Sequence, residues 1–100
     1  MHKMLVLYPP PTDPDHFRSY YEETHLPLVK KLPGLKAHRH SFSVQGVGKA
    51  SPYFCVFEAD FANEAAMGAA MSSPEGKAVA ADVKNYATGG VTILHYDTSS

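Results

Sequence analysis

Hydrophobic residues fall into six segments along the chain, and the spacing within each segment indicates a strand or a helix. Strand-like segments cover residues 2–8, about 35–44, 53–61 and 91–96. Between them, residues 13–31 and 62–86 place apolar side chains at helical spacing. The order β-α-β-β-α-β predicts an α+β, ferredoxin-like protomer. Its four-stranded antiparallel sheet carries the helices on one face.

Prolines mark where the predicted helices begin and break. The first helix has Thr12 or Asp13 as its N-cap and Pro14 at its first position. Pro27 is expected to kink or interrupt this helix near His25, because proline has no amide proton for the helical hydrogen bond. The second helical segment is expected to restart at a Ser-Pro pair in the same way.

The predicted strands are apolar on both faces, although a sheet face left open to water should be polar. In segment 2–8, Met4, Val6 and Tyr8 lie on one face and Leu5 and Leu7 on the other. In segment 53–61, Tyr53, Cys55 and Phe57 lie opposite Phe54 and Val56. In segment 91–96, Val91 and Ile93 lie opposite Leu94 and Tyr96. Two such sheets stacked ~10 Å apart bury both surfaces. The pattern therefore predicts a homodimer through the sheet faces. The alternative is a different strand register in which the second face is half polar.

Composition limits the partners that this chain is expected to have. One hundred residues with nine Lys plus Arg and ten Asp plus Glu predict one domain over residues 1–100, with a polar tail from about 97. No basic row suits nucleic acid, and no apolar run approaches the ~20 residues that span a membrane. Without a leader pattern, a cytoplasmic location is expected. Cys55, the lone cysteine, excludes an internal disulfide and is predicted to be a buried small hydrophobe.

His25 is the leading candidate for chemistry. It follows Tyr21 by four residues, so the two share a helix face with Phe17 beside the break at Pro27. An imidazole with a pKa near ~6.5 suits a general acid or base, and Tyr21 or Tyr20 would orient a substrate. Alternatively, the His25 ring donates to a backbone carbonyl freed by the proline and fixes the bend. The predicted catalytic residues are His25 and Tyr21, and the predicted substrate-binding residues are Tyr20, Phe17, Tyr8 and His95.

Two further histidines, His38 and His40, share one face of a predicted strand. With Glu58 or His95 they would make a set of metal ligands, but the neighbouring Arg39 favours an exposed basic edge, and no metal is predicted. The glycines of the hairpin turn do not form a phosphate-binding loop, and no nucleophilic triad is present in the sequence. We therefore expect no bound cofactor.

The roles of four other polar residues are less determined by the pattern. His95 either reaches the ligand pocket or makes a hydrogen bond at the sheet edge. His2 and His16 are predicted to be solvated. Asp82, near the end of the second helical segment, is predicted to cap the following turn, with a catalytic role as the alternative.

Several segments in combination resemble the EthD family, in particular the short bacterial subgroup labelled EthD family reductase. They are HKMLVLYP at 2–9, FRSYYEETHLPL at 17–28, LPGL at 32–35, SPEG at 73–76 and ADVKNYATGGVT at 81–92. The resemblance covers almost the whole chain, apart from the hairpin turn near residues 46–52 and the tail.

The resemblance implies a dimeric α+β barrel and a place beside an oxygenase system, as in bacterial degradation of ethyl tert-butyl ether. Related barrels include cofactor-free monooxygenases, polyketide cyclases and isomerases, with a pocket between helices and sheet. The implied function is a cofactor-free, oxidoreductase-type enzyme or accessory protein of oxidative catabolism that binds a small apolar or aromatic molecule. Two alternatives stay open. One is a non-catalytic dimeric module that binds a small molecule or an oxygenase partner, and the other is a cyclase- or isomerase-like activity.

Overall fold

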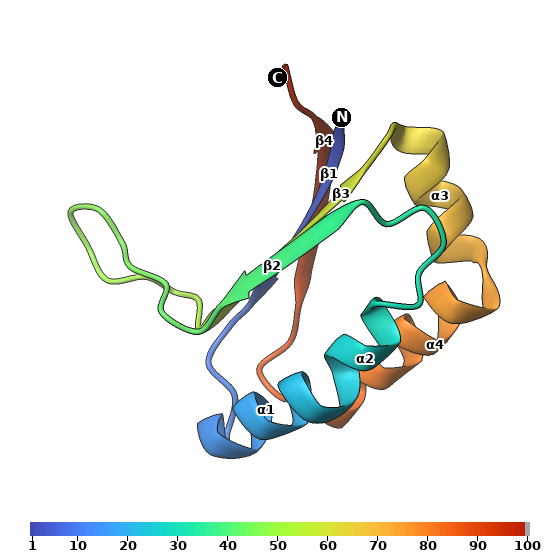
Figure 1. Ribbon diagram of the computed structural model, residues 1–100. Helices are drawn as coiled ribbons and strands as arrows, with labels where there is room; N and C mark the ends of the chain where they lie inside the picture. The colour runs from blue at the N-terminus through green and yellow to red at the C-terminus, as the bar shows by residue number, and fades with distance from the viewer. Residues whose placement is uncertain (100) are drawn as a thin grey trace.

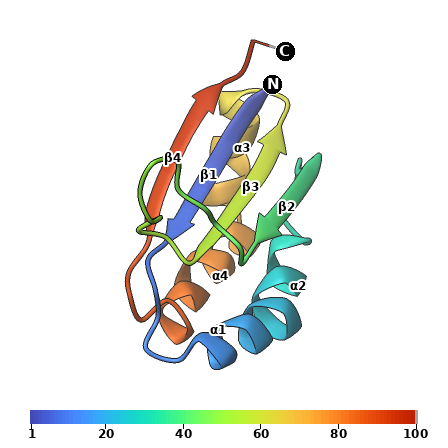
Figure 2. The same ribbon diagram turned by 90° about the vertical axis from the view of Figure 1, so that its left-hand side faces the viewer.

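A four-stranded antiparallel sheet carries all the helices on one of its faces (Figure 1). The computed structural model describes residues 1–99. The strands are β1 (His2–Tyr8), β2 (Ala37–Ser41), β3 (Cys55–Phe61) and β4 (Thr92–Asp97), in the spatial order β2-β3-β1-β4 (Figure 2). This arrangement confirms the predicted α+β, ferredoxin-like protomer.

The two central strands, β1 and β3, alternate strictly between buried and half-buried residues. Their buried side chains face the helices and form the core, with Val6 paired to Phe57 of β3 and to Ile93 of β4. Cys55 is fully buried in this layer, as predicted. Ile93 belongs to the same face but is 53% exposed, and every residue of the edge strand β4 is exposed.

The opposite face of the sheet is half apolar and half charged. Leu5 lies opposite Leu94 in the apolar half. In the charged half, Lys3 Nζ lies 2.9 Å from Glu58 Oε1, and Arg39 donates to Glu58 and Asp60 at 3.0 and 2.8 Å. The expectation of an apolar second face is therefore wrong on the β2–β3 side, where the face is polar, as the alternative stated. The register sets Arg39 opposite Glu58 and Lys3 opposite Asp60, so opposite charges neutralise one another there.

The first helical segment is interrupted near His25, as Pro27 predicts. It consists of α1 (Pro14–Tyr20), a π-helical turn (Tyr21–His25) and α2 (Leu26–Val29). The Leu26 amide bonds to the Tyr21 carbonyl, five residues back. Because Pro27 has no amide proton and its ring crowds the preceding turn, a widened turn costs less here than a regular one. The Asp13 carboxylate caps α1 by accepting from the His16 amide at 3.1 Å.

The second helical segment restarts at a Ser-Pro pair, also as expected. Its parts are α3 (Glu64–Ser72), α4 (Pro74–Asp82) and a 3₁₀ turn (Val83–Asn85). The Ser73 hydroxyl caps α4 by accepting from the Gly76 amide at 3.1 Å. Gly76 lies against the backbone of Ala70 and Met71 with no space for a Cβ atom, which allows α3 and α4 to pack closely.

The β2–β3 hairpin has a longer connection than the sequence predicts. Residues 42–54 form a loop that projects from the side of the sheet opposite the helices (Figures 1 and 2). The strand predicted over about 35–44 is shorter at both ends, the strand predicted over 53–61 is shorter at its loop end, and the last strand begins and ends one residue later than predicted. Ser100, the last residue of the predicted tail, lies outside the described residues. Within residues 1–99, no helix is long and apolar enough to cross a membrane.

Candidate functional site

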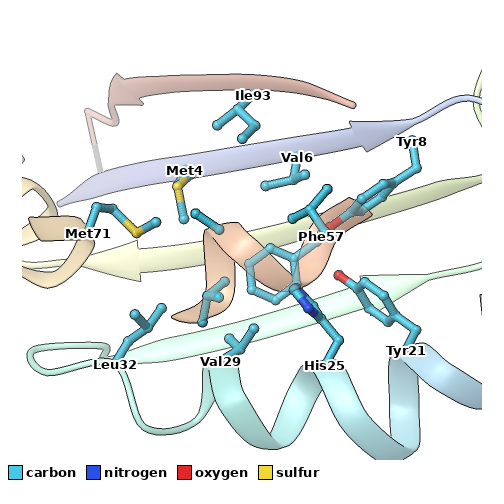
Figure 3. A pocket seen from close by; sticks show the side chains of 13 residues that line it. Met4, Val6, Tyr8, Tyr21, His25, Val29, Leu32, Phe57, Met71 and Ile93 are labelled. Carbon is cyan, nitrogen blue, oxygen red and sulfur yellow. The ribbon is translucent and has the colours of Figure 1, made fainter. Parts of the chain in front are cut away.

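A cavity of about 60 Å³ lies between the helices and the sheet (Figure 3). Its walls come from β1, β3, β4, the π-helical turn, α2 and the loop after it, α3, α4 and the 3₁₀ turn. They are almost entirely apolar. The lining residues are Met4, Val6, Tyr8, Tyr21, His25, Val29, Leu32, Phe57, Met71, Val79, Ala80, Val83 and Ile93. Ala80 and Ile93 are exposed while most of the others are buried, so the cavity opens between α4 and the edge strand β4.

His25 enters this cavity from the last residue of the π-helical turn. Its side chain is buried, with its ring stacked on Tyr21 at a centroid distance of 5.2 Å and 4.6 Å from the Tyr86 ring centroid. Nδ1 lies 2.9 Å from the Asp82 Oδ2 atom. A carboxylate only accepts, so Nδ1 carries the proton and Nε2 holds a lone pair. His25 thus presents a proton acceptor beside an apolar cavity.

Asp82, at the end of α4, receives three hydrogen bonds. In addition to His25 on Oδ2, Tyr20 donates its hydroxyl to Oδ1 at 2.6 Å and Asn85 donates its amide to Oδ1 at 3.0 Å. Burial favours the neutral acid, but the hydrogen bonds from Tyr20, Asn85 and His25 outweigh it and lower the Asp82 pKa. Asp82 is therefore a carboxylate at neutral pH and keeps the imidazole oriented.

Burial determines the charge state of the other site residues. Desolvation lowers the pKa of His25 below its ordinary value, although the bond to Asp82 acts in the opposite direction. Burial raises the pKa of Tyr8 to about 12 and raises the pKa values of Tyr21 and Tyr86 as well. At neutral pH the site therefore contains a neutral imidazole and protonated phenols.

The tyrosine hydroxyls at the cavity differ in their bonding. Tyr8 and Tyr86 hydroxyls are hydrogen-bonded to each other at 2.8 Å in the core. The Tyr21 hydroxyl is fully buried and has no hydrogen-bond partner among residues 1–99. An unpartnered buried hydroxyl is costly. The Tyr8 hydroxyl is near enough to affect the pKa of Tyr21, but the two groups do not reach regular hydrogen-bond geometry in this structure.

Three of the predicted site residues, His25, Tyr21 and Tyr8, meet at the cavity. The structure does not bring Tyr20, Phe17 or His95 to it. Tyr20 contacts Asp82 instead, and Phe17 is a core residue in edge contact with Tyr8 at 5.3 Å. His95 lies near the end of β1 that is opposite to Tyr8, where its Nδ1 atom is 2.9 Å from Nε2 of His2.

His2 is not solvated, contrary to the prediction. It is 3% exposed and its Nδ1 atom lies 2.6 Å from an Asp97 oxygen. The alternation of side chains along the strand could have predicted this burial. His2 lies on the same face of β1 as Met4, and that face is buried. The prediction for His16 is confirmed, since it is exposed.

The predicted basic edge on β2 is also wrong. His38 and His40 are half-buried on the helix side, with His38 packed on the Phe57 ring at 6.0 Å. Arg39 points to the other face, where it pairs with acids. Nowhere in the described part of the chain do three His, Cys, Asp or Glu side chains gather as metal ligands would.

Asp82 is the site residue whose partner sequence reasoning missed. It was expected to cap a turn, and His25 was expected, in its structural role, to donate to a backbone carbonyl; the partner is the Asp82 carboxylate instead. A signal existed, because Val79, Asp82 and Tyr86 follow helical spacing and all three are buried. An acid on the apolar stripe of a helix indicates a specific partner.

The fold and the site define a ferredoxin-like α+β protein with a buried aspartate–histidine pair at an apolar cavity between helices and sheet. The chain belongs to the EthD family, whose domain matches residues 9–90. It is 35% identical over 97 residues to an uncharacterized 11.0 kDa protein in the thcB–thcC intergenic region of Rhodococcus erythropolis, covering 97% of this chain and 94% of that protein.

Solved structures agree with this assignment. An ethyl tert-butyl ether degradation (EthD) family protein from Bacillus halodurans is 28% identical, with a TM-score of 0.90 and 98% of both chains covered. Two others share the fold alone. They are a dimeric ferredoxin-like protein of unknown function from Jannaschia (18% identity, TM-score 0.77, 97% and 98% covered) and SnoaB, a cofactor-independent oxygenase from Streptomyces nogalater (14%, 0.69, 99% and 93% covered).

Proposed function

We propose that this EthD-family protein binds a small, largely apolar organic molecule in the cavity and transfers a proton with His25. The observation that carries the proposal is one imidazole at the apolar cavity, with Nδ1 held by Asp82 at 2.9 Å and with no hydrogen bond to Nε2 from any of residues 1–99. The ring is neutral at neutral pH because burial lowers its pKa. It can therefore accept a proton from a bound molecule.

Asp82 acts as the positioning residue for this base. Its carboxylate selects the tautomer with the proton on Nδ1 and stabilises the imidazolium that forms when Nε2 takes a proton. Tyr20 and Asn85 hold the second carboxylate oxygen and so keep Asp82 in place. A positioned base of this kind contributes roughly 10²–10⁴-fold to a rate.

The size of the cavity limits what it encloses. A dry protein cavity of ~150 Å³ takes up benzene, whereas this cavity measures about 60 Å³. Its enclosed part therefore suits the reactive end of a ligand. The rest of a larger molecule, including an aromatic one, would extend past Ile93 through the opening between α4 and β4.

The reaction belongs, in this proposal, to cytoplasmic oxidative catabolism without a bound cofactor, alongside an oxygenase partner. Support comes from the Bacillus halodurans relative, named for ethyl tert-butyl ether degradation, and from SnoaB, a cofactor-independent oxygenase that shares the fold. Proton transfer without oxygen, as in a cyclase or isomerase, uses the same His25–Asp82 pair. A non-catalytic ligand-binding module is the competing class.

Deprotonation of nitroethane tests the proposal, because this small C–H acid is no larger than the reactive end that the cavity accepts. The wild-type protein should form the nitronate at least 100-fold faster than the same concentration of free imidazole, followed by ultraviolet absorbance. The rate should fall as acid protonates His25, with a midpoint below ~6.5 because the pKa of His25 is lowered. A rate equal to that of free imidazole identifies a non-catalytic binding module.

Asp82→Asn provides the readout specific to positioning. Asp82 raises the His25 pKa through its hydrogen bond and its charge, against the larger effect of burial. Removing that charge should move the midpoint of the pH–rate profile to lower pH, in addition to slowing the reaction. A purely structural contact would slow the reaction without moving the midpoint.

We also propose that the protein is a homodimer through the apolar half of the open sheet face. Leu94 and Tyr96 are 49% and 43% exposed on β4, beside Leu5 of β1. Contiguous exposed apolar surface of this kind marks an interface. The protein from Jannaschia, which has the same fold and is described as dimeric, supports a dimer here.

Leu94→Asp should convert the dimer to a monomer, because it places a carboxylate in the apolar contact. We expect the dissociation constant to rise roughly 100-fold, measured by analytical ultracentrifugation. Ala69→Asp adds the same charge on the exposed side of α3 and should leave the dimer intact. Equal effects of the two variants, or a wild-type monomer, would contradict the proposed interface.

A further inference from the structure

The Tyr21 hydroxyl indicates which chemical group the cavity accepts. It belongs to a side chain with 0% exposure, lines the cavity and lacks a hydrogen-bond partner among the described residues. Figure 3 shows it pointing from the π-helical turn toward the sheet, to the same region as the Tyr8 hydroxyl. Since a buried hydroxyl is nearly always satisfied in a native protein, a bound molecule is its natural partner.

Tyr8 can supply a second donor to that region. Its hydroxyl is 2.8 Å from the Tyr86 hydroxyl, and when Tyr86 donates, the Tyr8 proton can point toward the cavity and the nearby Tyr21 hydroxyl, which also affects the pKa of Tyr8. A chain of hydroxyls polarised in this sense makes its last member a better donor. Both phenols remain protonated at neutral pH because burial raises their pKa values.

We propose that the cavity binds an enolisable carbonyl compound, with its oxygen on the Tyr21 and Tyr8 hydroxyls and a C–H bond next to the carbonyl at His25 Nε2. This inference rests on the proposed function, since it names the substrate class for the same site. One donor, Tyr8, lies on β1, whereas the other donor, Tyr21, and the base, His25, are the first and last residues of the π-helical turn.

The lining selects against charged groups. A carboxylate or phosphate needs a compensating cation, and the lining residues include no lysine or arginine. An ammonium ion would need an acceptor anion, but the Asp82 oxygens are already occupied by His25, Tyr20 and Asn85. A neutral acceptor such as a ketone oxygen satisfies Tyr21 and leaves its hydrocarbon part in contact with apolar walls.

The proton transfer that follows is balanced without any co-reactant. His25 Nε2 takes the proton from the carbon next to the carbonyl, and the C–H electron pair forms a carbon–carbon double bond. The carbonyl π pair moves to the oxygen, where the Tyr21 and Tyr8 hydroxyls stabilise the negative charge. The imidazolium, paired with Asp82, then returns the proton to carbon or to oxygen and gives the isomerised product or the enol.

Cyclopentanone and methylenecyclopentane test the inference, since the second probe replaces the carbonyl oxygen by CH₂ at nearly the same size. Titrations followed by the methyl NMR signals of the cavity should give wild-type protein a roughly tenfold preference for the ketone. Tyr21→Phe, which removes the hydroxyl and nothing else, should reduce the preference, because only the Tyr8 donor remains, while the affinity for the hydrocarbon is unchanged or rises. His25→Asn should keep it.

The outcomes of these experiments distinguish the carbonyl site from the proton transfer by His25. Equal affinities in the wild type, a preference that is undiminished in Tyr21→Phe, or no binding of either probe overturns the carbonyl site. A ketone preference that depends on Tyr21, in a protein that does not accelerate nitroethane deprotonation, upholds the carbonyl site and refutes proton transfer by His25. Nitroethane deprotonation without a ketone preference upholds the base and refutes the substrate class.

Discussion

Replacing His25 with asparagine is expected to slow nitroethane deprotonation at least 100-fold at pH 7. Asparagine Nδ2 occupies the place of histidine Nδ1, so it can still donate to Asp82, but it has no atom at the position of Nε2. The variant therefore loses the proton acceptor while the carboxylate of Asp82 keeps a partner. Cyclopentanone binding should change little, because the hydroxyl of Tyr21 is unaffected.

The matched control is His95→Asn, which removes an imidazole from β4 near the opposite end of the sheet. His95 is bonded to His2 and does not line the cavity, so this variant should retain the wild-type rate. Circular dichroism and thermal unfolding verify that both variants fold. A His25→Asn protein that is folded, binds cyclopentanone and keeps its full rate rules out His25 as the base.

Phe17→Ala is expected to lower the free energy of unfolding by about 3–5 kcal/mol, a large part of the ~5–15 kcal/mol that stabilises a domain. The Phe17 side chain has 0% exposure, and its ring centroid lies 5.3, 5.5 and 5.0 Å from those of Tyr8, Tyr21 and Tyr86. Truncation leaves a void among three tyrosines of the site. Urea denaturation followed by circular dichroism measures the loss.

Phe54→Ala serves as the comparison for Phe17. Phe54 is half-buried, with the Arg18 guanidinium 5.0 Å from its ring centre, and it packs on the edge of the same cluster. Its truncation leaves an open surface that water can occupy, so the loss should be less than half of that for Phe17. Equal losses would show that Phe17 does not hold the cluster together.

Part of the site follows from local sequence signals. His25 and Tyr21 are four residues apart beside a proline, and the structure places both at the cavity. Phe17 has the same helical spacing but packs into the core, because spacing specifies a face of the helix and not which part of that face borders a void. Catalysis by His25 and Tyr21 stays a prediction until the kinetic tests are done.

The partner of Asp82 could not be predicted from the sequence. Asp82 is separated from His25 by 57 positions, and its role depends on how α4 docks against the π-helical turn. The same holds for the Tyr8–Tyr86 hydroxyl pair, 78 positions apart. A buried acid on the apolar stripe of a helix indicates that it has a hydrogen-bond donor as its partner. Several side chains of the first helical segment could donate, and only the packing of the helices decides which of them does.

The sequence by itself determined the order of the elements, the start of the first helix at Thr12 or Asp13, the cap at Ser73, and the break near His25 before Pro27. These are local effects, since a missing amide proton or a capping hydroxyl acts within one turn. Only the tertiary structure decided the partners of His25 and His2, and the charged half of the open sheet face. Those contacts depend on strand register and helix docking, where a shift of one residue sends every side chain of a strand to the opposite face.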